Sequence, residues 1–517
     1  MIKKIIKVLL ITFVTLFLII FYLSIFGIKT NKFNNQITNS ILKINKQINL
    51  SLSDANYLLN PYNFTINIKT KNPQILVKGR SLNIKNIQTN VALKSLINNK
   101  FSIDDLQITT KEIKLNDIVS FVRVFQNSPQ LFILDQIIKD GFATVNISLN
   151  FNEKGKVKEN YKIEGSIKKA KLDIINQLKL ENLNFNFDIN KNNYSLKKIN
   201  AKFNNIDVTS PLIKIKYKKN SFFINGQILN DNKNFDIKEI KPILPNLFSN
   251  IDVKEIEFSS KNSFSFNINK KLKLENFKVQ SIIELSKLTI NEKNLKLKSY
   301  IPNFVEKIRF EKHKINIDYE KNKFNIKGKG NILLKNKIDN LSYQIIKNKN
   351  NFSFDSKINL KNNSLLIDFL DYEKKEGLNS LVLIKGNFKK NNLLSFDLIS
   401  LKEKNNEIKI KGLDLNKNFK ITDIKNFNIN YENNKKILNN LNLTKDNSNF
   451  IIKGKSFDAS RIINNIMDDN EESSSIFDNL NSKINIKIKK TYIDDVNLSL
   501  IHISEPTRRT PISYAVF

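Results

Sequence analysis

The sequence offers few side chains that could carry out chemistry. Its 517 residues include no Cys and two His, His313 and His502. Without Cys there is no disulfide or thiol chemistry, so cysteine usage gives no information on the compartment. Two histidines argue against a His-based metal or acid–base site.

The acidic residues do not form a convincing site either. Asp104-Asp105 and Asp494-Asp495 are adjacent pairs, and adjacent residues of a strand point to opposite faces. The acidic segment Asp468-Asp-Asn-Glu-Glu-Ser-Ser-Ser475 matches no calcium-loop spacing, so we expect a solvated loop. No phosphate loop, dinucleotide fingerprint, H-E-x-x-H or G-x-S-x-G motif occurs. We therefore predict no catalytic, cofactor-binding or metal site, and a protein that is not an enzyme.

The formal net charge of +36 would ordinarily suggest nucleic acid or an anionic membrane as partner. Nucleic-acid binding is not favoured, because proteins that recognise bases and phosphates prefer Arg, and Arg is scarce here. Lys is spread evenly, which fits compositional bias and solubility, or a weak attraction to anionic headgroups. The Arg residues are Arg80, Arg123, Arg309, Arg461, Arg508 and Arg509.

The strongest pattern is strict alternation of apolar and polar residues, clearest at Leu183-Asn-Phe-Asn-Phe-Asp-Ile-Asn190. Alternation predicts β-strands with one apolar and one wet face. Similar runs begin at Val145, Ile213, Phe264, Ile315, Phe427 and Ile484. Runs rich in Asn separate them and predict tight turns.

A second recurrence is apolar-x-Gly, as in Ile163-Glu-Gly165 and Ile384-Lys-Gly386. Glycine inside a strand is typical of a bulge or bend, and repeated bends would curl a sheet.

The N-terminus predicts a membrane anchor. Val8 to Phe26 carries no charge and follows Lys3, Lys4 and Lys7. At ~1.5 Å per residue it is about as long as a bilayer core is thick, and the preceding lysines favour a cytoplasmic N-terminus. We expect residues 1–28 to be an uncleaved transmembrane helix, with the bulk of the chain outside the cytoplasm.

The pattern of residues 29–140 predicts a region of mixed helices and strands. Phe33 to Ile48 has helical spacing of its apolar residues, and so has Asn116 to Lys139, where Pro129 should break or kink the helix. We expect this second helix to pack on the sheet; the alternative is that it gates a cavity.

Residues 141–500 predict an elongated repetitive β region, with a short helix at Asp458 to Ile466. Residues 501–517 contain neither Lys nor Asn, unlike the rest of the chain. We expect this tail to be non-native, and the natural protein to continue beyond about Leu500.

The β region has more apolar face than its helices can cover. Roughly 360 residues at ~12 per strand give about 30 strands. An apolar face left in water promotes aggregation, so the strands must bury it as a sandwich, a closed barrel or a rolled groove. A groove could carry acyl chains.

The chain resembles the AsmA-like family of bacterial envelope proteins. The resemblance lies in Tyr57-Leu-Leu-Asn-Pro-Tyr-Asn-Phe-Thr-Ile-Asn-Ile-Lys69, in residues 90–108, and in Phe450-Ile-Ile-Lys-Gly-Lys-Ser-Phe-Asp-Ala-Ser-Arg-Ile-Ile463. It implies an inner-membrane anchor, a taco-shaped periplasmic β-sheet and bridge-like movement of phospholipid between the two membranes. Because this chain ends early, it would be a C-terminally truncated member.

We therefore expect a mainly β protein with an elongated, curved antiparallel sheet, an N-terminal transmembrane helix and a few short helices. It would bridge or shield phospholipid transport between the inner and outer membranes. Its partners would be phospholipids, the inner membrane and outer-membrane or periplasmic proteins, and no nucleic acid. The alternatives are an assembly scaffold for outer-membrane proteins and a filled-core structural protein. The candidate lipid-facing residues are Phe185, Phe187, Ile189, Phe264, Phe266, Phe352 and Phe354.

Overall fold

A computed structural model describes most of the chain. The described residues are 2–32, 34–35, 38, 48–53, 55–77, 80–93, 103–125, 128–152, 156–174, 178–218, 220–243, 252–291, 297–304, 306–349, 351–389, 393–417, 420–447, 449–467, 483–493 and 496–505. The predicted helix at Phe33 to Ile48, the acidic segment 468–475 and the pair Asp494-Asp495 lie largely or wholly outside them.

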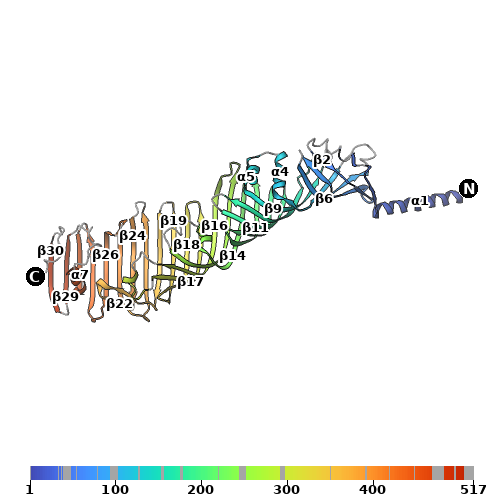
Figure 1. Ribbon diagram of the computed structural model, residues 1–517. Helices are drawn as coiled ribbons and strands as arrows, with labels where there is room; N and C mark the ends of the chain where they lie inside the picture. Colours follow the sequence, from blue (N-terminus) through green and yellow to red (C-terminus); the bar gives the residue numbers. More distant parts are fainter. Residues whose placement is uncertain are drawn as a thin grey trace. The chain divides into compact units, whose positions relative to one another are not determined.

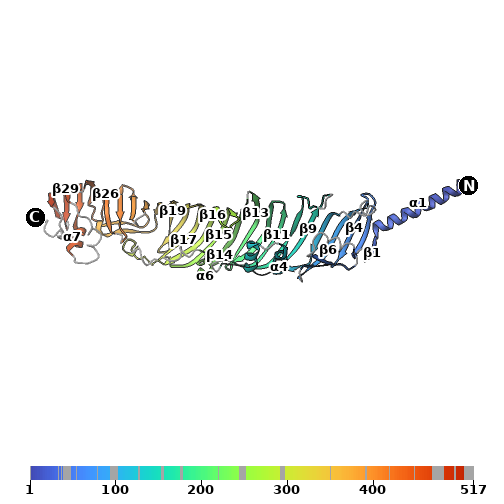
Figure 2. The ribbon, with the colours of Figure 1, turned by 90° about the horizontal axis from the view of Figure 1, so that it is seen from above.

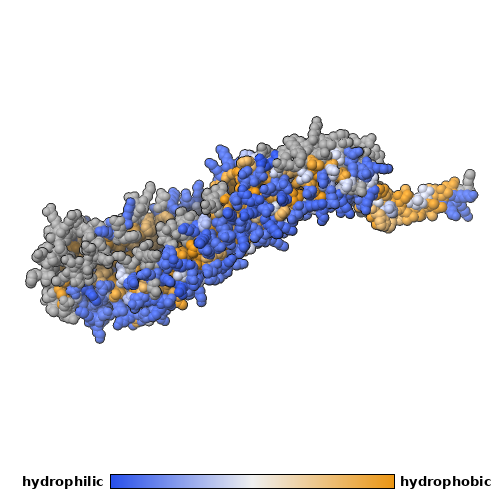
Figure 3. Space-filling view, viewed as in Figure 1, coloured by the Kyte–Doolittle hydropathy of each residue, from blue (hydrophilic) through white to orange (hydrophobic). Residues whose placement is uncertain are grey.

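The chain begins with helix α1 (Ile2–Ile25), which matches the predicted apolar segment. None of its Lys3–Ile25 span is buried against the rest of the protein, and it is long and apolar enough to cross a membrane. In Figure 3 it is apolar along most of its length, with hydrophilic residues at its N-terminal end. A signal sequence near an N-terminus can meet the same criteria of length and apolar composition.

The rest divides into two compact units. Unit 1 comprises Met1–Asn230 and Ser265–Glu275, and unit 2 comprises Asp231–Phe264 and Asn276–Phe517. In each unit most strands are long, antiparallel and paired with the next strand in sequence (Figures 1 and 2).

Unit 1 is an open antiparallel sheet. Its strands are β1 (Ile28–Thr30), β2 (Ile48–Ser51), β3 (Ala55–Asn60), β4 (Thr65–Lys71), β5 (Gln74–Val77), β6 (Arg80–Ala92), β7 (Ile103–Thr110), β8 (Ile113–Lys114), β9 (Ile138–Asn150), β10 (Lys162–Ile174), β11 (Leu178–Asn190), β12 (Asn193–Phe203), β13 (Ile206–Lys218) and β14 (Ser221–Phe235), which continues beyond the boundary. The main pairing runs β1–β3–β4–β6–β7–β9 and then in sequence order to β14. β5 joins β6 to β2, and β8 pairs with β9.

The helical stretch predicted at Asn116 to Lys139 is two helices, α4 (Leu115–Phe125) and α5 (Pro129–Ile137). The break falls at Pro129, as predicted, because proline lacks the backbone N–H that a helix interior needs. Proline is well suited to the first turn, where it starts α5 behind the capping hydroxyl of Ser128. Ile138 and Lys139, predicted as helix, instead begin β9.

Unit 2 has a similar ladder. Its strands are β16 (Leu274–Asn291), β17 (Lys307–Glu320), β18 (Lys323–Leu334), β19 (Lys337–Asn348), β20 (Asn351–Leu360), β21 (Leu365–Ile367), β22 (Tyr372–Lys374), β23 (Ser380–Lys389), β24 (Leu393–Glu403), β25 (Asn406–Leu415), β26 (Ile421–Glu432), β27 (Leu438–Asp446), β28 (Asn449–Asp458), β29 (Ile484–Ile493) and β30 (Val496–Glu505). β15 (Asp252–Asn269) and the start of β16 cross the unit boundaries. The shorter elements are α6 (Ile237–Ile240), η1 (Leu297–Ser299), η2 (Asp368–Leu370) and α7 (Ser460–Met467), the last confirming the predicted short helix.

Consecutive main strands from β16 to β30 pair antiparallel, except that β28 and β29 are parallel. β21 and β22 form a separate two-stranded ribbon inserted between β20 and β23. The predicted class is confirmed: the described chain is mainly β, with a large, mostly antiparallel and open sheet.

Asn occupies several tight turns, as expected, although the Asn-rich run Asn230-Asp-Asn-Lys-Asn234 lies within β14 and is not a turn. Asn205, Asn220, Asn322 and Asn336 all have positive φ in short connections between strands. Asn tolerates this left-handed backbone better than most residues, which suits it to tight hairpins.

Bulges are not confined to the glycines. Lys169, Asn182 and Lys312 have positive φ where the strand register shifts. Of the two glycines named as bulges or bends, Gly386 lies at a register shift, as predicted, whereas Gly165 lies in regular register opposite Phe187.

Candidate functional site

An unbroken apolar row crosses the sheet of unit 1. Directly opposed residues of antiparallel strands carry their side chains on the same face. From β7 to β14 the successive opposed residues are Ile108, Ile147, Ile163, Ile189, Tyr194, Ile215 and Ile224. At ~4.8 Å between strands, the row extends roughly 29 Å, about the thickness of the hydrocarbon core of a bilayer.

A second row lies next to it on the same face. From β9 to β14 it contains Val145, Gly165, Phe187, Leu196, Ile213 and Gly226. Every residue of both rows is half-buried. A second packed layer would bury such side chains almost completely; here neighbours shield their flanks while part of each stays accessible. We call these two rows the unit 1 apolar face.

Next to the unit 1 apolar face, the sheet is covered by α4. Leu115 and Val119 of α4 are buried against the strands. The strand residues buried with them are Ile138, Ala143, Ala170, Leu183 and Ala201. Three of these are alanines, whose small side chains leave room for a helix. The contact agrees with the prediction that this helix packs on the sheet.

The mid-strand glycines make room for large side chains. A Cβ on Gly165 would lie 2.7 Å from Cζ of Phe187, and one on Gly386 would lie 2.7 Å from Cζ of Phe354. Both contacts are shorter than van der Waals distance. The tip of each ring therefore lies over the glycine of the neighbouring strand, and a backbone oxygen lies closer still to the same position.

Unit 2 has three comparable rows from β16 to β24. The row next to the hairpin turns, which we call the edge row, is Val279, Tyr319, Phe324, Lys347, Phe352, Phe388 and Leu394. The second row is Ser281, Ile317, Ile326, Ile345, Phe354, Gly386 and Phe396. The third is Ile283, Ile315, Gly328, Tyr343, Ser356, Ile384 and Ile399.

The aromatic rings of these rows contact one another across strands. Phe324 and Phe352 have ring centroids 5.6 Å apart, and Phe354 lies 5.9 Å from Phe396 and 6.2 Å from Phe388. Edge-to-face contacts of this kind add to the stability gained by burial. Phe388 is nonetheless 48% exposed, so the cluster has no complete cover.

Two chain segments cover other parts of unit 2. Ile301 and Phe304, which follow η1, are buried against Ile308, Ile332 and Leu341. Leu370 and Tyr372, from the segment between β20 and β23, are buried in a further cluster. Its other buried members are Leu401, Ile408, Ile429, Tyr431, Phe457 and Ile488.

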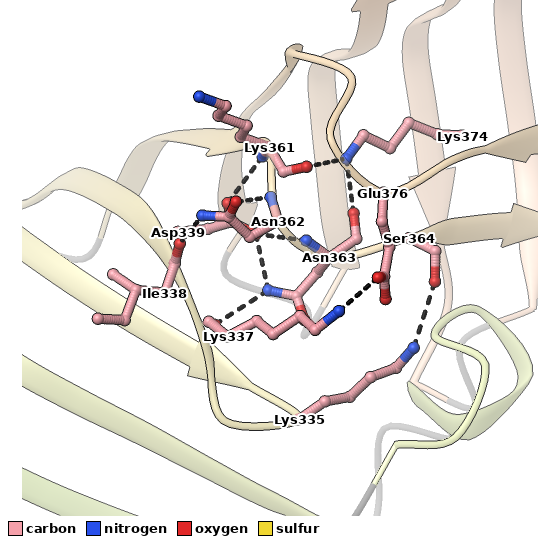
Figure 4. Close-up of polar contacts among 10 residues, drawn as sticks. All are labelled: Lys335, Lys337, Ile338, Asp339, Lys361, Asn362, Asn363, Ser364, Lys374 and Glu376. Carbon is pink, nitrogen blue, oxygen red and sulfur yellow. Dashed lines mark hydrogen bonds and ion pairs between the residues drawn. The ribbon is translucent and has the colours of Figure 1, made fainter.

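The segment between β20 and β23 is held by a buried polar cluster (Figure 4). Asp339 of β19 is 1% exposed. Its Oδ1 accepts hydrogen bonds from the backbone N–H of Lys361 (2.7 Å) and Asn362 (2.9 Å), and its Oδ2 from the backbone N–H (3.1 Å) and Nδ2 (2.7 Å) of Asn363. Nζ of the fully buried Lys374 donates to the carbonyl oxygens of Lys361 (3.0 Å) and Asn363 (2.6 Å).

Burial shifts the ionisation of several groups in unit 2. Desolvation lowers the pKa of Lys374, and Asp339 partly opposes this shift. Desolvation raises the pKa of Tyr372, whose hydroxyl donates to Oε2 of Glu403 at 2.7 Å. It also raises the pKa of Tyr431, whose hydroxyl donates to the Leu370 carbonyl oxygen. These groups hold the covering segment in place, and none of them lies in the edge, second or third row of unit 2.

The predicted lipid-facing residues fall into three groups. Phe187, Ile189, Phe352 and Phe354 belong to the half-buried rows. Phe185 is half-buried and packs against the cluster under α4.

Phe264 and Phe266 form the third group. Both are half-buried residues of β15, where the polar neighbour Ser265 is equally half-buried. The burial pattern therefore does not separate an apolar from a wet face at these two positions. The unit boundary also falls between them.

Two features were missed by the sequence reasoning. One is Lys347 in the edge row. The alternation in Tyr343-Gln-Ile-Ile-Lys347 is a weak sequence signal for it, because it places Lys347 on the same face of the strand as Tyr343 and Ile345. The other is the covering segment that contains β21 and β22, whose short apolar run resembles any other strand.

The described residues hold no cluster of side chains suited to a metal ion. Within the part of the chain that the structure describes, no group of three or more His, Asp or Glu side chains could hold a metal ion. Asp105 accepts a hydrogen bond from the backbone N–H of Asn90, while the adjacent Asp104 is exposed. The two carboxylates therefore have different surroundings.

Comparison with known proteins adds no identification. No protein-family model matches the chain, and no curated protein matches it.

Proposed function

We propose that this protein shields the acyl chains of phospholipids on the exposed apolar rows of its units. α1 would anchor it in the bacterial inner membrane, with the sheet in the periplasm and phospholipid moving between the inner and outer membranes. The acyl-chain binding rests on the apolar rows, and the two membranes and the periplasm are taken from what the resemblance to the AsmA-like family implies.

The observation that carries the proposal is the unit 1 apolar face. Its residues stay in register across consecutive strands, and all are half-buried. Each CH₂ group that leaves water for such a surface gains ~0.8 kcal/mol. An acyl chain lying along the rows would remove its own surface and that of the face from water together.

The opposite face of the same strands is polar, which suits a protein working in water. Ser195 and Lys214 are opposed on this outer face, between the apolar positions of β12 and β13. In Figure 3 the strands between the two ends of the molecule present a mostly hydrophilic surface to the viewer. The apolar rows therefore lie on one side of the sheet, and the other side is polar.

The proposal concerns β7–β14 and β16–β24. Toward the last strands of unit 2, the chain covers its own apolar face with Leu370, Tyr372 and α7, as in a filled core. Acyl chains would have to displace that cover, so we do not assign lipid binding to β26–β29.

The test is mass spectrometry of lipids that co-purify with the full-length chain. We expect phospholipid on the wild type and several-fold less on Ile215→Asp, which places a charge in the unit 1 row. Ser195→Asp is the matched control, because it adds the same charge on the opposite face of the neighbouring strand. Hydrogen exchange of β12 and β13 shows whether each variant is folded. Absence of lipid from the wild type, or equal loss in both folded variants, contradicts the proposal.

A further inference from the structure

Lys347 is the charged member of an otherwise apolar edge row. It lies directly opposite Phe324 on one side and Phe352 on the other. Opposed residues share a face, so its side chain leaves the sheet on the apolar side. A charge on that side needs an explanation, since ionised groups are costly to remove from water.

The ammonium of Lys347 is held over the two rings. Its Nζ lies 5.0 Å from the ring centroid of Phe352 and 6.0 Å from that of Phe324, within cation–π range. Among the described residues it makes no ion pair with a carboxylate. The ammonium has three N–H donors. The two rings do not satisfy all of them, because an aromatic face is not a full hydrogen-bond acceptor.

The edge row lies at the end of the strands where the connections are short. β17–β18 and β19–β20 turn there, and Lys321 and Lys349 occupy those turns. The segment with η1 and the segment with β21 and β22 leave from the opposite strand ends. These two segments therefore do not cover this edge of the sheet. The lysines in its turns make the edge basic.

Aromatic rings beside lysines are typical of the boundary between hydrocarbon and water. Tyr and Trp lie at the headgroup level of membranes, and Lys extends its stem along apolar surface while its ammonium reaches the polar layer. The edge row contains one such tyrosine, Tyr319, and one such lysine beside three phenylalanines. Ile317, Ile326 and Ile345 of the second row lie on its inner side.

We propose that Lys347 binds the phosphate of an anionic phospholipid headgroup, while the acyl chains lie on the second and third rows of unit 2. An N⁺–H···O⁻ hydrogen bond to phosphate satisfies donors that the rings leave free. The edge of short hairpins is then the side from which headgroups project. This inference rests on the proposed function and adds headgroup selectivity and orientation to it.

The experiment loads the purified full-length protein with fluorescent phosphatidylglycerol or phosphatidylcholine of identical acyl chains and measures the lipid retained. The wild type should prefer phosphatidylglycerol by about fivefold, the scale of one exposed charge pair, because phosphatidylglycerol has a net negative charge whereas the choline cation of phosphatidylcholine offsets its phosphate. Lys347→Met should remove the preference while phosphatidylcholine binding remains, and Lys347→Arg should keep it. Lys323→Met is the control, since Lys323 lies beside Phe324 but on the opposite face.

Each outcome has a separate meaning. Retention of both lipids with no preference, or a preference that survives Lys347→Met, overturns the headgroup site and leaves the proposed function standing. Retention of neither lipid by the wild type overturns the proposed function itself. Displacement of the bound lipid by millimolar inorganic phosphate would show a site for free anions, which also contradicts the inference.

Discussion

Tyr343 lies across Gly328 on the neighbouring strand. A Cβ on Gly328 would be 2.2 Å from Cζ and 2.5 Å from the hydroxyl oxygen of Tyr343. The residues are directly opposed in the register of β18 and β19. The three nearest atoms to that Cβ all belong to the Tyr343 side chain, so this side chain is the first obstacle to a larger residue at position 328.

Gly328→Ala should therefore destabilise the sheet locally by about 1–3 kcal/mol, because the ring must leave its place. The measurement is hydrogen exchange of β18 and β19, which reports local opening. Lys327→Ala is the control, because Lys327 is exposed and points to the opposite face.

The same pair can be tested by a double-mutant cycle. Tyr343→Ala removes the obstructing ring, so Gly328→Ala should cost much less in that background than in the wild type. Additive effects of the two substitutions would show that the ring does not depend on the glycine.

Asp339→Asn should release the segment that carries β21 and β22. The substitution removes a buried charge that accepts four hydrogen bonds from residues 361–363. Bonds to charged groups contribute ~1.5–3 kcal/mol each, so a loss of several kcal/mol is expected. The measurement is faster hydrogen exchange in residues 365–374.

The control for Asp339 is Asp355→Asn. Asp355 pairs with Lys385 at 2.8 Å, but both side chains are about half exposed. Exposed pairs contribute ~0–1 kcal/mol, so little change is expected. Equal effects of the two substitutions would contradict the role assigned to Asp339.

His313 should make unit 2 less stable at acid pH. It is 2% exposed, and desolvation lowers its pKa below the usual value of 6.5. The unfolded chain then binds a proton that the folded chain rejects, so stability is complete above about pH 6.5 and falls as the pH drops toward the folded pKa. His313→Leu should reduce this loss, measured as urea unfolding of the full chain at pH 5 and pH 8.

His502→Gln serves as the comparison, since it removes the other histidine of the chain. It should leave the pH dependence in place. If the two variants behave alike, the buried imidazole is not the cause of the acid sensitivity.

Removal of residues 2–25 should release the protein from membranes without unfolding the sheet. α1 is apolar, and none of its Lys3–Ile25 span is buried against the rest of the chain, so the strands lose no core when it is deleted. Fractionation after alkaline washing measures the attachment, and circular dichroism measures the strand content. Loss of strand content in the truncated protein would show that α1 is part of the fold.

The alternation of residues predicted much of the fold. Leu183 to Asn190 was expected to be a two-faced strand and lies within β11. Pro129 was expected to break a helix, and it separates α4 from α5. These features follow from local geometry, which periodicity and proline chemistry report directly.

What covers the apolar side could not be predicted in the same way. Leu183 and Phe187 belong to one strand, yet Leu183 is buried near α4 and Phe187 is half-buried. The difference depends on where a distant helix packs, which local alternation does not encode. Gly328 was likewise expected as part of a bend, but the reason for its size is Tyr343, a cross-strand neighbour.

The most direct test of lipid shielding is photocrosslinking in cells with a benzophenone amino acid at position 187. Position 186 is the control, since Asn186 is exposed and points to the other face. Position 183 is a second control, since Leu183 is buried in the cluster with α4. We predict phospholipid adducts at position 187 and none at 186 or 183. Adducts to protein alone at position 187, or equal lipid labelling at 186 and 187, would contradict acyl-chain binding on this face.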